Sequence, residues 1–198
     1  MEETVSQDKI SAFQYRGVNH VALVCRDMAE TVDFYENVLE MPLIRSIGIG
    51  SHGQHFFFDC GNGATIAFFW FPNPPPFAPG VASQPLDIAK DGMMSAIASM
   101  NHLAIDIAPE TFDAAVARLR EKGVDCHVIN HSDGPTPAPN EPTDQTWIRS
   151  VYFTDPNGIK MEFAALTRPF LESDVLVEPV NEAGQPSPRR RKTPKMAQ

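Results

Sequence analysis

The chain has 198 residues, of which 42% are hydrophobic. This is enough for one compact domain and too little for two ordinary independent ones. The formal net charge is −9, and an acidic chain argues against nucleic acid as a partner. The longest apolar stretch, 64–72, is about half of a membrane-spanning helix, and the three cysteines form no CxxC pair. We therefore expect a cytoplasmic protein without a membrane partner, a disulfide framework or a thiolate zinc site.

The first part of the chain predicts a strand, a helix and further strands. Residues 18–24 alternate in polarity, and residues 27–39 place apolar side chains at helical spacing. The runs 54–59 and 64–71 are rich in aromatic and β-branched residues, and the Cys-Gly-Asn-Gly sequence between them suits a tight hairpin. With an additional strand near 43–49, the order is β-α-β-β-β.

A proline-rich connection follows. Six prolines between 72 and 85 exclude a regular element in the middle of this segment. A connection of this length either lies over a functional site or acts as a linker stiffened by proline.

The same order of elements then recurs. Residues 100–105 predict a strand, 109–122 a helix that stops at Gly123, 124–129 a strand, and 150–153 with 159–164 a hairpin. Asn19-His20 matches Asn101-His102, and the Gly-Asn-Gly turn of the first hairpin matches Pro-Asn-Gly at 156–158. The chain therefore contains an internal repeat. We predict an α+β fold in which two βαβββ modules form a cup-shaped mixed sheet around a central metal site.

The repeat also sets the expected boundaries. The domain spans 17–166, with module one at 17–72, the connection at 73–98 and module two at 99–166. An N-terminal extension covers 1–16 and a C-terminal extension covers 167–198. From about residue 173 the tail mixes proline, charged and amide residues without apolar periodicity, so we expect it to be disordered.

Three residues of metal-ligand type occupy related positions. His20 and His102 are equivalent residues on the first strand of each module, so both imidazoles would enter a shared interior if the two sheets face each other. Glu162 lies on the last strand, and its equivalent in module one is Ala67. Two histidines and one carboxylate suit Fe(II), and also Mn(II) or Zn(II). We predict that His20, His102 and Glu162 bind one divalent metal ion.

The motifs resemble the vicinal oxygen chelate superfamily, which groups glyoxalases, bleomycin-resistance proteins, epimerases and type I extradiol dioxygenases. The resemblance covers about 17–166 and rests on four segments: NHVALV (19–24), DFYENVL (33–39), NHLA (101–104) and YFTDPNG (152–158). Glyoxalase-like members usually have a ligand where this chain has Ala67. The ligand pattern is more similar to that of extradiol dioxygenases, which also have a tyrosine ten residues before the glutamate, matched by Tyr152.

The resemblance therefore implies Fe(II), with Mn(II), Zn(II), Ni(II) or Co(II) as alternatives, and no organic cofactor. Tyr152 would hydrogen-bond a substrate hydroxyl, unless it is a core residue of the hairpin. Extradiol enzymes usually have two further histidines, and the matching positions here are Ala64 and the segment 143–145, which ends in Gln145. His55 is the candidate acid-base replacement, the alternative being a hydrogen-bonded histidine at a strand end.

His127 and His131 are interpreted as surface residues or as residues that contact the metal ligands without binding the ion. The many phenylalanines between 56 and 71 suit an aromatic or hydrophobic substrate.

The first hypothesis is thus an extradiol-type dioxygenase acting with O2 on a catechol-like compound. The second is a metal-dependent lyase or isomerase working through an enediolate, with Glu162 or His55 as base. The third is a non-catalytic binding protein. A homodimer is common in the resembling superfamily.

Overall fold

A computed structural model describes residues 15–133, 138–175 and 177–187. The described residues 15–133 and 138–168 belong to one compact unit, and the described residues 169–175 and 177–187 belong to a second. The described part of the second unit contains a 3-10 turn, η4 (Glu172–Asp174), and a bridge between Val180 and Pro186. The predicted N-terminal extension lies almost entirely outside the described residues, and disorder of the tail stays a prediction.

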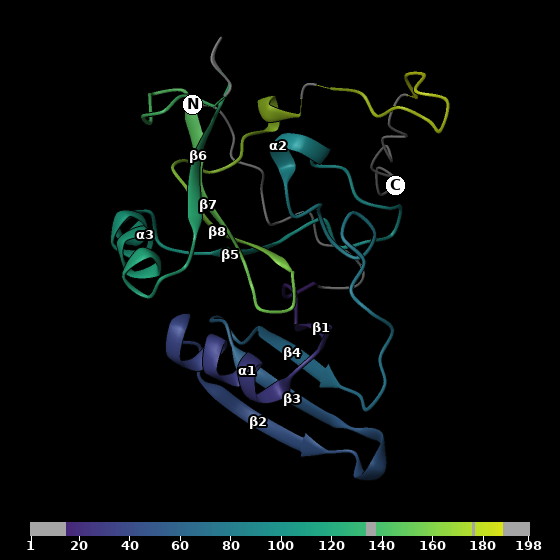
Figure 1. Ribbon diagram of the computed structural model, residues 1–198. Coiled ribbons are helices and arrows are strands. Elements are labelled where there is room, and N and C mark those ends of the chain that lie inside the picture. The colour runs from purple at the N-terminus through teal and green to yellow at the C-terminus, as the bar shows by residue number, and fades with distance from the viewer. Residues whose placement is uncertain (1–14, 134–137, 176, 188–198) are drawn as a thin grey trace, which may run out of the picture. The chain divides into compact units, whose positions relative to one another are not determined.

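The first module is a four-stranded sheet in the order β1-β4-β3-β2, with a helix packed on one face (Figure 1). β1 runs parallel to β4, and the other neighbours are antiparallel. The predicted helix begins at its N-cap Asp27, whose carboxylate accepts a hydrogen bond from the Glu30 amide at 3.0 Å. Its elements are β1 (His20–Cys25), α1 (Met28–Val32), the π-helix η1 (Asp33–Val38), β2 (Leu43–Gly48), η2 (Gly50–His52), β3 (Gln54–Asp59) and β4 (Thr65–Trp70).

The second module repeats this arrangement in the order β5-β8-β7-β6. Its strands β6 and β7 extend further than the sequence predicts, because they remain paired from Cys126 and Phe153 to Ser132 and Thr146. The predicted α+β fold of two βαβββ modules is confirmed. The elements are β5 (Leu103–Asp106), η3 (Pro109–Thr111), α3 (Phe112–Glu121), β6 (Cys126–Ser132), β7 (Thr146–Thr154) and β8 (Lys160–Leu166).

The pairing registers show how closely the modules correspond. Ala22, two residues after His20, pairs with Ala67. Ala104, two residues after His102, pairs with Glu162. The predicted equivalence of Ala67 and Glu162 is therefore confirmed, because both residues occupy the same place in the parallel ladder of their module.

The connection between the modules lies against the second one. Ser83, Gln84 and Pro85 are buried, and the Lys160 amide donates to the Ser83 hydroxyl at 3.2 Å. A short helix, α2 (Ile88–Asp91), begins after the last proline of this segment. No helix in the described parts of the chain combines the length and apolar character needed to cross a membrane.

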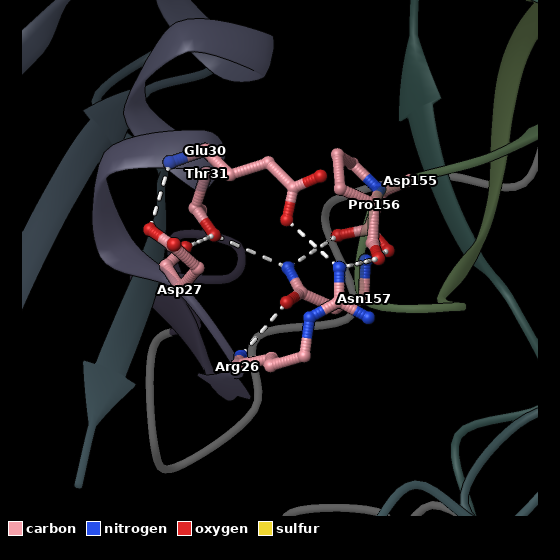
Figure 2. Close-up of polar contacts among 7 residues, drawn as sticks. All are labelled: Arg26, Asp27, Glu30, Thr31, Asp155, Pro156 and Asn157. Atoms are coloured by element: carbon pink, nitrogen blue, oxygen red, sulfur yellow. Dashed lines mark hydrogen bonds and ion pairs between the residues drawn. The ribbon is translucent and has the colours of Figure 1, made fainter. Parts of the chain in front are cut away.

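The two modules contact each other through helix α1 and the β7–β8 turn (Figure 2). The Arg26 amide donates to Asn157 Oδ1 at 2.9 Å, and Asn157 Nδ2 donates to the Thr31 hydroxyl at 3.3 Å. Behind these contacts, the buried Tyr35 hydroxyl donates to Asp155 Oδ2 at 3.3 Å. Burial raises the pKa of Asp155, and hydrogen bonds from Ile159 and other neighbours oppose this rise.

We expect Tyr35→Phe to lower the free energy of unfolding by about 1–2 kcal/mol, because it removes a buried hydrogen bond to a carboxyl group. The matched comparison is Glu40→Gln, which breaks the exposed inter-module ion pair between Glu40 and Arg118. That variant should change stability very little, since exposed ion pairs contribute little. Urea denaturation of both variants tests this. An unchanged Tyr35→Phe protein would show that the buried contact does not stabilise the unit.

Candidate metal centre

His102 and Glu162 lie side by side in the second module. His102 directly precedes β5, and its Nε2 is 3.1 Å from Glu162 Oε2. The Glu162 side chain is buried, and its second oxygen, Oε1, accepts a hydrogen bond from the Ser150 hydroxyl at 2.5 Å. Ser150 therefore holds the carboxylate in one orientation and leaves Oε2 directed at His102.

An asparagine precedes each of the two repeated histidines and orients it. The Nδ1 atom of His102 is 2.9 Å from Asn101 Oδ1, and that of His20 is 2.8 Å from Asn19 Oδ1. An amide oxygen only accepts, so in these contacts each imidazole donates from Nδ1 and directs Nε2 away from the asparagine. This is the usual way in which a protein fixes a metal-binding histidine. The sequence analysis did not predict that Asn19 and Asn101 orient the histidines, although the repeated Asn-His pair indicates it.

The buried connection supports the same arrangement. Gln84 Nε2 donates to Asn101 Oδ1 and lies 3.4 Å from His102 Nδ1. The Ser83 hydroxyl donates to the Asn101 carbonyl at 3.3 Å. Of the two interpretations of this proline-rich segment, the structure favours the one in which it lies beside the functional site.

A pocket of about 970 Å³ opens beside His102. Alternate residues of β6, namely His127, Ile129 and His131, line it together with Tyr152 of β7. The Tyr152 hydroxyl is 3.4 Å from His131 Nε2, and its ring centre is 5.8 Å from that of His102. His127 and His131 thus line the same pocket. Their spacing of four residues could have predicted this, because it places both side chains on one face of a strand, and β6 is longer than the predicted strand.

The electrostatics of the pocket keep Tyr152 protonated. Burial, followed by the negative charge of Glu162, raises the pKa of Tyr152 to about 12. The phenol is therefore a neutral donor at physiological pH. Lys160 also lines the pocket and donates to the Thr154 hydroxyl at 3.0 Å. Burial lowers the pKa of Lys160, and burial together with the Lys160 charge lowers that of His127.

The structure places His20 elsewhere. It is exposed on β1, with its ring centre 6.0 Å from that of Phe57. The ring centre of His55 is 4.3 Å from that of Phe57. His55 also stacks on Phe69 at 3.6 Å, and its Nδ1 is 3.1 Å from the Phe68 carbonyl oxygen. Neither histidine lines the pocket beside His102.

Within the described residues, no group of three or more His, Cys, Asp or Glu side chains is arranged to hold a metal ion. One chain therefore brings together His102 and Glu162, with Tyr152 close by, and does not bring His20 or His55 to them. Ala64 and Gln145 do not line the pocket either.

The His102–Glu162 pair nevertheless fits a divalent metal ion. An imidazole Nε2 and a carboxylate oxygen converge, each fixed from behind by a hydrogen bond, and the adjacent pocket leaves room for further ligands. That the ion is bound by His20, His102 and Glu162 stays a prediction.

The chain belongs to the Glyoxalase/Bleomycin resistance protein/Dioxygenase superfamily, whose family model matches residues 17–163. This superfamily is the vicinal oxygen chelate group that the sequence motifs resemble, so that prediction is confirmed. Its members are mostly metalloenzymes and generally use divalent metal ions.

Solved structures with the same fold come from several bacteria. A glyoxalase/dioxygenase from Nostoc punctiforme is 22% identical, with a TM-score of 0.52 over 80% of this chain and 97% of that protein. A glyoxalase family protein from Enterococcus faecalis is 17% identical, with a TM-score of 0.51 over 76% and 98%. The fosfomycin resistance protein FosX from Listeria monocytogenes, in a monoclinic crystal form, is 22% identical, with a TM-score of 0.50 over 77% and 95%. At these identities the likeness establishes the fold alone.

We expect Ser150→Ala to weaken metal binding by about 10- to 100-fold, because the Glu162 carboxylate loses the donor that orients it. Titration with Co(II), followed by its visible absorption, measures this effect. Ser46→Ala, which removes an exposed hydroxyl from β2, is the matched control and should bind Co(II) like the wild type. Equal affinities for the two variants would contradict the orienting role.

Proposed function

We propose that this protein is a metal-dependent enzyme of the extradiol dioxygenase type, acting on a catechol-like aromatic or related vicinal-oxygen substrate. The observation that carries the proposal is the convergence of His102 Nε2 and Glu162 Oε2, 3.1 Å apart, at a pocket lined by Tyr152. Fe(II) is the proposed metal, since the predicted set of His20, His102 and Glu162, with open positions, is typical of non-haem iron oxygenases.

When bound, the metal would supply coordination positions for two vicinal substrate oxygens and for O2 in one place. The residues of the chain then position the substrate and handle protons. The neutral Tyr152 hydroxyl is placed to donate a hydrogen bond to a substrate oxygen. His131 Nε2, 3.4 Å from that hydroxyl, is placed to exchange a proton with it. Together they supply the titratable groups that Ala64 and Gln145 lack.

The shape and lining of the pocket support an aromatic or hydrophobic substrate. Its volume of about 970 Å³ lies near the upper end of the usual range for small-molecule sites. Leu86 and Met93 of the connection and Ile129 of β6 provide apolar surface. His102, His131 and Tyr152 line the same pocket, so a small molecule could direct its oxygen atoms toward these polar groups and the proposed metal.

A second candidate is a metal-dependent lyase or isomerase that works through an enediolate. The observation that favours it is Lys160, a buried cation that lines the same pocket two residues before Glu162. A fixed positive charge of this kind stabilises a developing oxyanion.

O2 consumption separates the two candidates. Protein loaded anaerobically with Fe(II) should consume O2 with a panel of catechols and form a yellow ring-fission product. Turnover without O2 in the presence of Zn(II), Ni(II) or Co(II), and none with catechols, would instead support the lyase or isomerase.

We expect Tyr152→Phe to lower kcat by about 10²-fold or more while iron content stays unchanged, because proton transfer is lost and the metal ligands remain. His52→Ala, which changes an exposed histidine of η2, is the matched control and should retain wild-type kcat. A Tyr152→Phe enzyme with wild-type kcat would remove Tyr152 from the reaction.

A further inference from the structure

A buried lysine lines the pocket beside the candidate metal centre. Lys160 begins β8 and is only 8% exposed. Its Nζ atom donates to the Thr154 hydroxyl at 3.0 Å. An ammonium group has three donor hydrogens, so this contact leaves two of them for other partners. In the described parts of the chain, no carboxylate forms an ion pair with this lysine.

The carboxylates that line the pocket have other partners or lie further away. Glu30 pairs with Arg26 at 2.8 Å, and Asp87 accepts a hydrogen bond from an amide of α2. Asp155 accepts hydrogen bonds from the β7–β8 turn. Burial lowers the pKa of the lysine, and the exposed Asp125 opposes this effect without forming an ion pair. The buried positive charge therefore has no close opposite charge among the described residues.

A buried charge is costly unless an opposite charge and hydrogen bonds compensate for it. Lysine in particular is rarely buried without a partner. Because Lys160 lines a pocket large enough for a small molecule, a bound anion can supply the opposite charge and accept the remaining hydrogen bonds. The partner that the chain does not provide is thus expected from a ligand.

The strand register places this lysine next to the candidate metal centre. Lys160 lies two residues before Glu162, so both side chains project from the same face of β8. Across the β7–β8 ladder, Lys160 pairs with Thr154 and Glu162 pairs with Tyr152. Two residues along a strand correspond to about 6–7 Å. The lysine and the glutamate are therefore neighbouring positions on one wall of the pocket.

A histidine borders the same part of the wall. His127 of β6 pairs with Tyr152, and the centres of the two rings are 5.4 Å apart. Burial and, after it, the Lys160 charge lower the pKa of His127, so the field of the lysine extends into the pocket. A neutral imidazole at this position can donate one hydrogen bond to an anion.

We propose that Lys160 binds a carboxylate group of the substrate, so that the substrate is an aromatic vicinal diol with a carboxylate on the side of the ring away from the diol. The inference rests on the proposed function, since the diol is the part that the metal would bind. A benzene ring can span the separation between the two positions on β8. The formal net charge of the chain is −9, so an anionic substrate needs a local cation of this kind.

This role differs from the stabilisation of a developing oxyanion. A carboxylate is charged before and during the reaction, so its contact with Lys160 is equally strong in the bound substrate and in the transition state. Uniform binding of this kind changes KM and leaves kcat unchanged. Lys160 thus determines which substrate binds, while Tyr152 and the proposed metal act on the diol.

The test compares two compounds of similar shape, 3,4-dihydroxybenzoate and its uncharged amide, 3,4-dihydroxybenzamide. Calorimetry without O2 measures their binding to the full-length protein, once with Co(II) bound and once with all metal removed. The wild type should bind the carboxylate about 10- to 100-fold more tightly than the amide, because the amide lacks the charge-assisted hydrogen bond. The metal-free protein should show a preference in the same direction.

Lys160→Met should abolish this preference and leave the affinity for the amide close to that of the wild type, because methionine removes the charge and retains an unbranched side chain. Lys160→Gln, which can still hydrogen-bond to Thr154, is the second variant if the methionine protein does not fold. The matched control is Lys90→Met, at an exposed lysine of α2 outside the pocket lining. It should retain the full preference.

Steady-state kinetics of the Fe(II)-loaded protein separate binding from chemistry. Lys160→Met should raise KM for 3,4-dihydroxybenzoate about 10- to 100-fold and leave kcat nearly unchanged. A lowered kcat with unchanged KM would overturn the binding role.

A wild type that binds both compounds equally, or a preference that survives the loss of the lysine, would overturn the carboxylate subsite. O2 uptake with uncharged catechols would then leave the proposed function standing. A preference for the carboxylate without O2 uptake would instead overturn the dioxygenase reaction and leave the subsite. A protein that binds neither compound, with or without metal, would overturn both proposals.

Discussion

The contact between helix α1 and the β7–β8 turn determines what each module can present to a ligand. Asp155 accepts hydrogen bonds from Tyr35 and from the amides of Asn157 and Ile159, so a buried carboxyl group ties the first module to a turn of the second. A buried polar group is costly unless it is hydrogen-bonded, and this one has partners from both modules. Because the contact uses the helical side of the first module, the sheet face that carries His20 remains open.

The His102–Glu162 pair, the candidate metal centre of the second module, is fixed by local hydrogen bonds. Asn101 Oδ1 contacts His102 Nδ1 and orients the ring, and the Ser150 hydroxyl orients Glu162. The connection between the modules adds Gln84 behind Asn101. These residues lie outside the expected ligand set, yet they decide whether the imidazole and the carboxylate can share one ion.

Much of this organisation could be predicted from the sequence, because a repeat carries geometric information. The alignment of Asn19-His20 with Asn101-His102 places both histidines at the same position of their modules. The observed strand registers confirm the predicted equivalence of Ala67 and Glu162. Alternation along a strand fixes which side chains share a face. It does not fix how two modules pack, because that depends on tertiary contacts such as Tyr35 with Asp155.

The same limit explains what sequence reasoning missed in the pocket. The predicted strand at 124–129 ends before His131, whereas β6 pairs with β7 as far as Ser132. This extra length brings His131 to Tyr152 and gives the pocket a titratable pair. Membership of the superfamily establishes the fold, whereas the metal and the reaction of this chain stay proposals, because one fold supports many chemistries.

The central claim is a metal ion at the His102–Glu162 pair, completed by His20. A crystal structure of the Co(II)-loaded protein, with anomalous data collected at the cobalt edge, tests it most directly. The predicted result is one anomalous peak bonded to His102 Nε2, to a Glu162 oxygen and to a His20 Nε2, at about 2.0–2.2 Å. A peak bound by other residues, or a cobalt ion bonded to His102 and Glu162 without any His20, would contradict the claim.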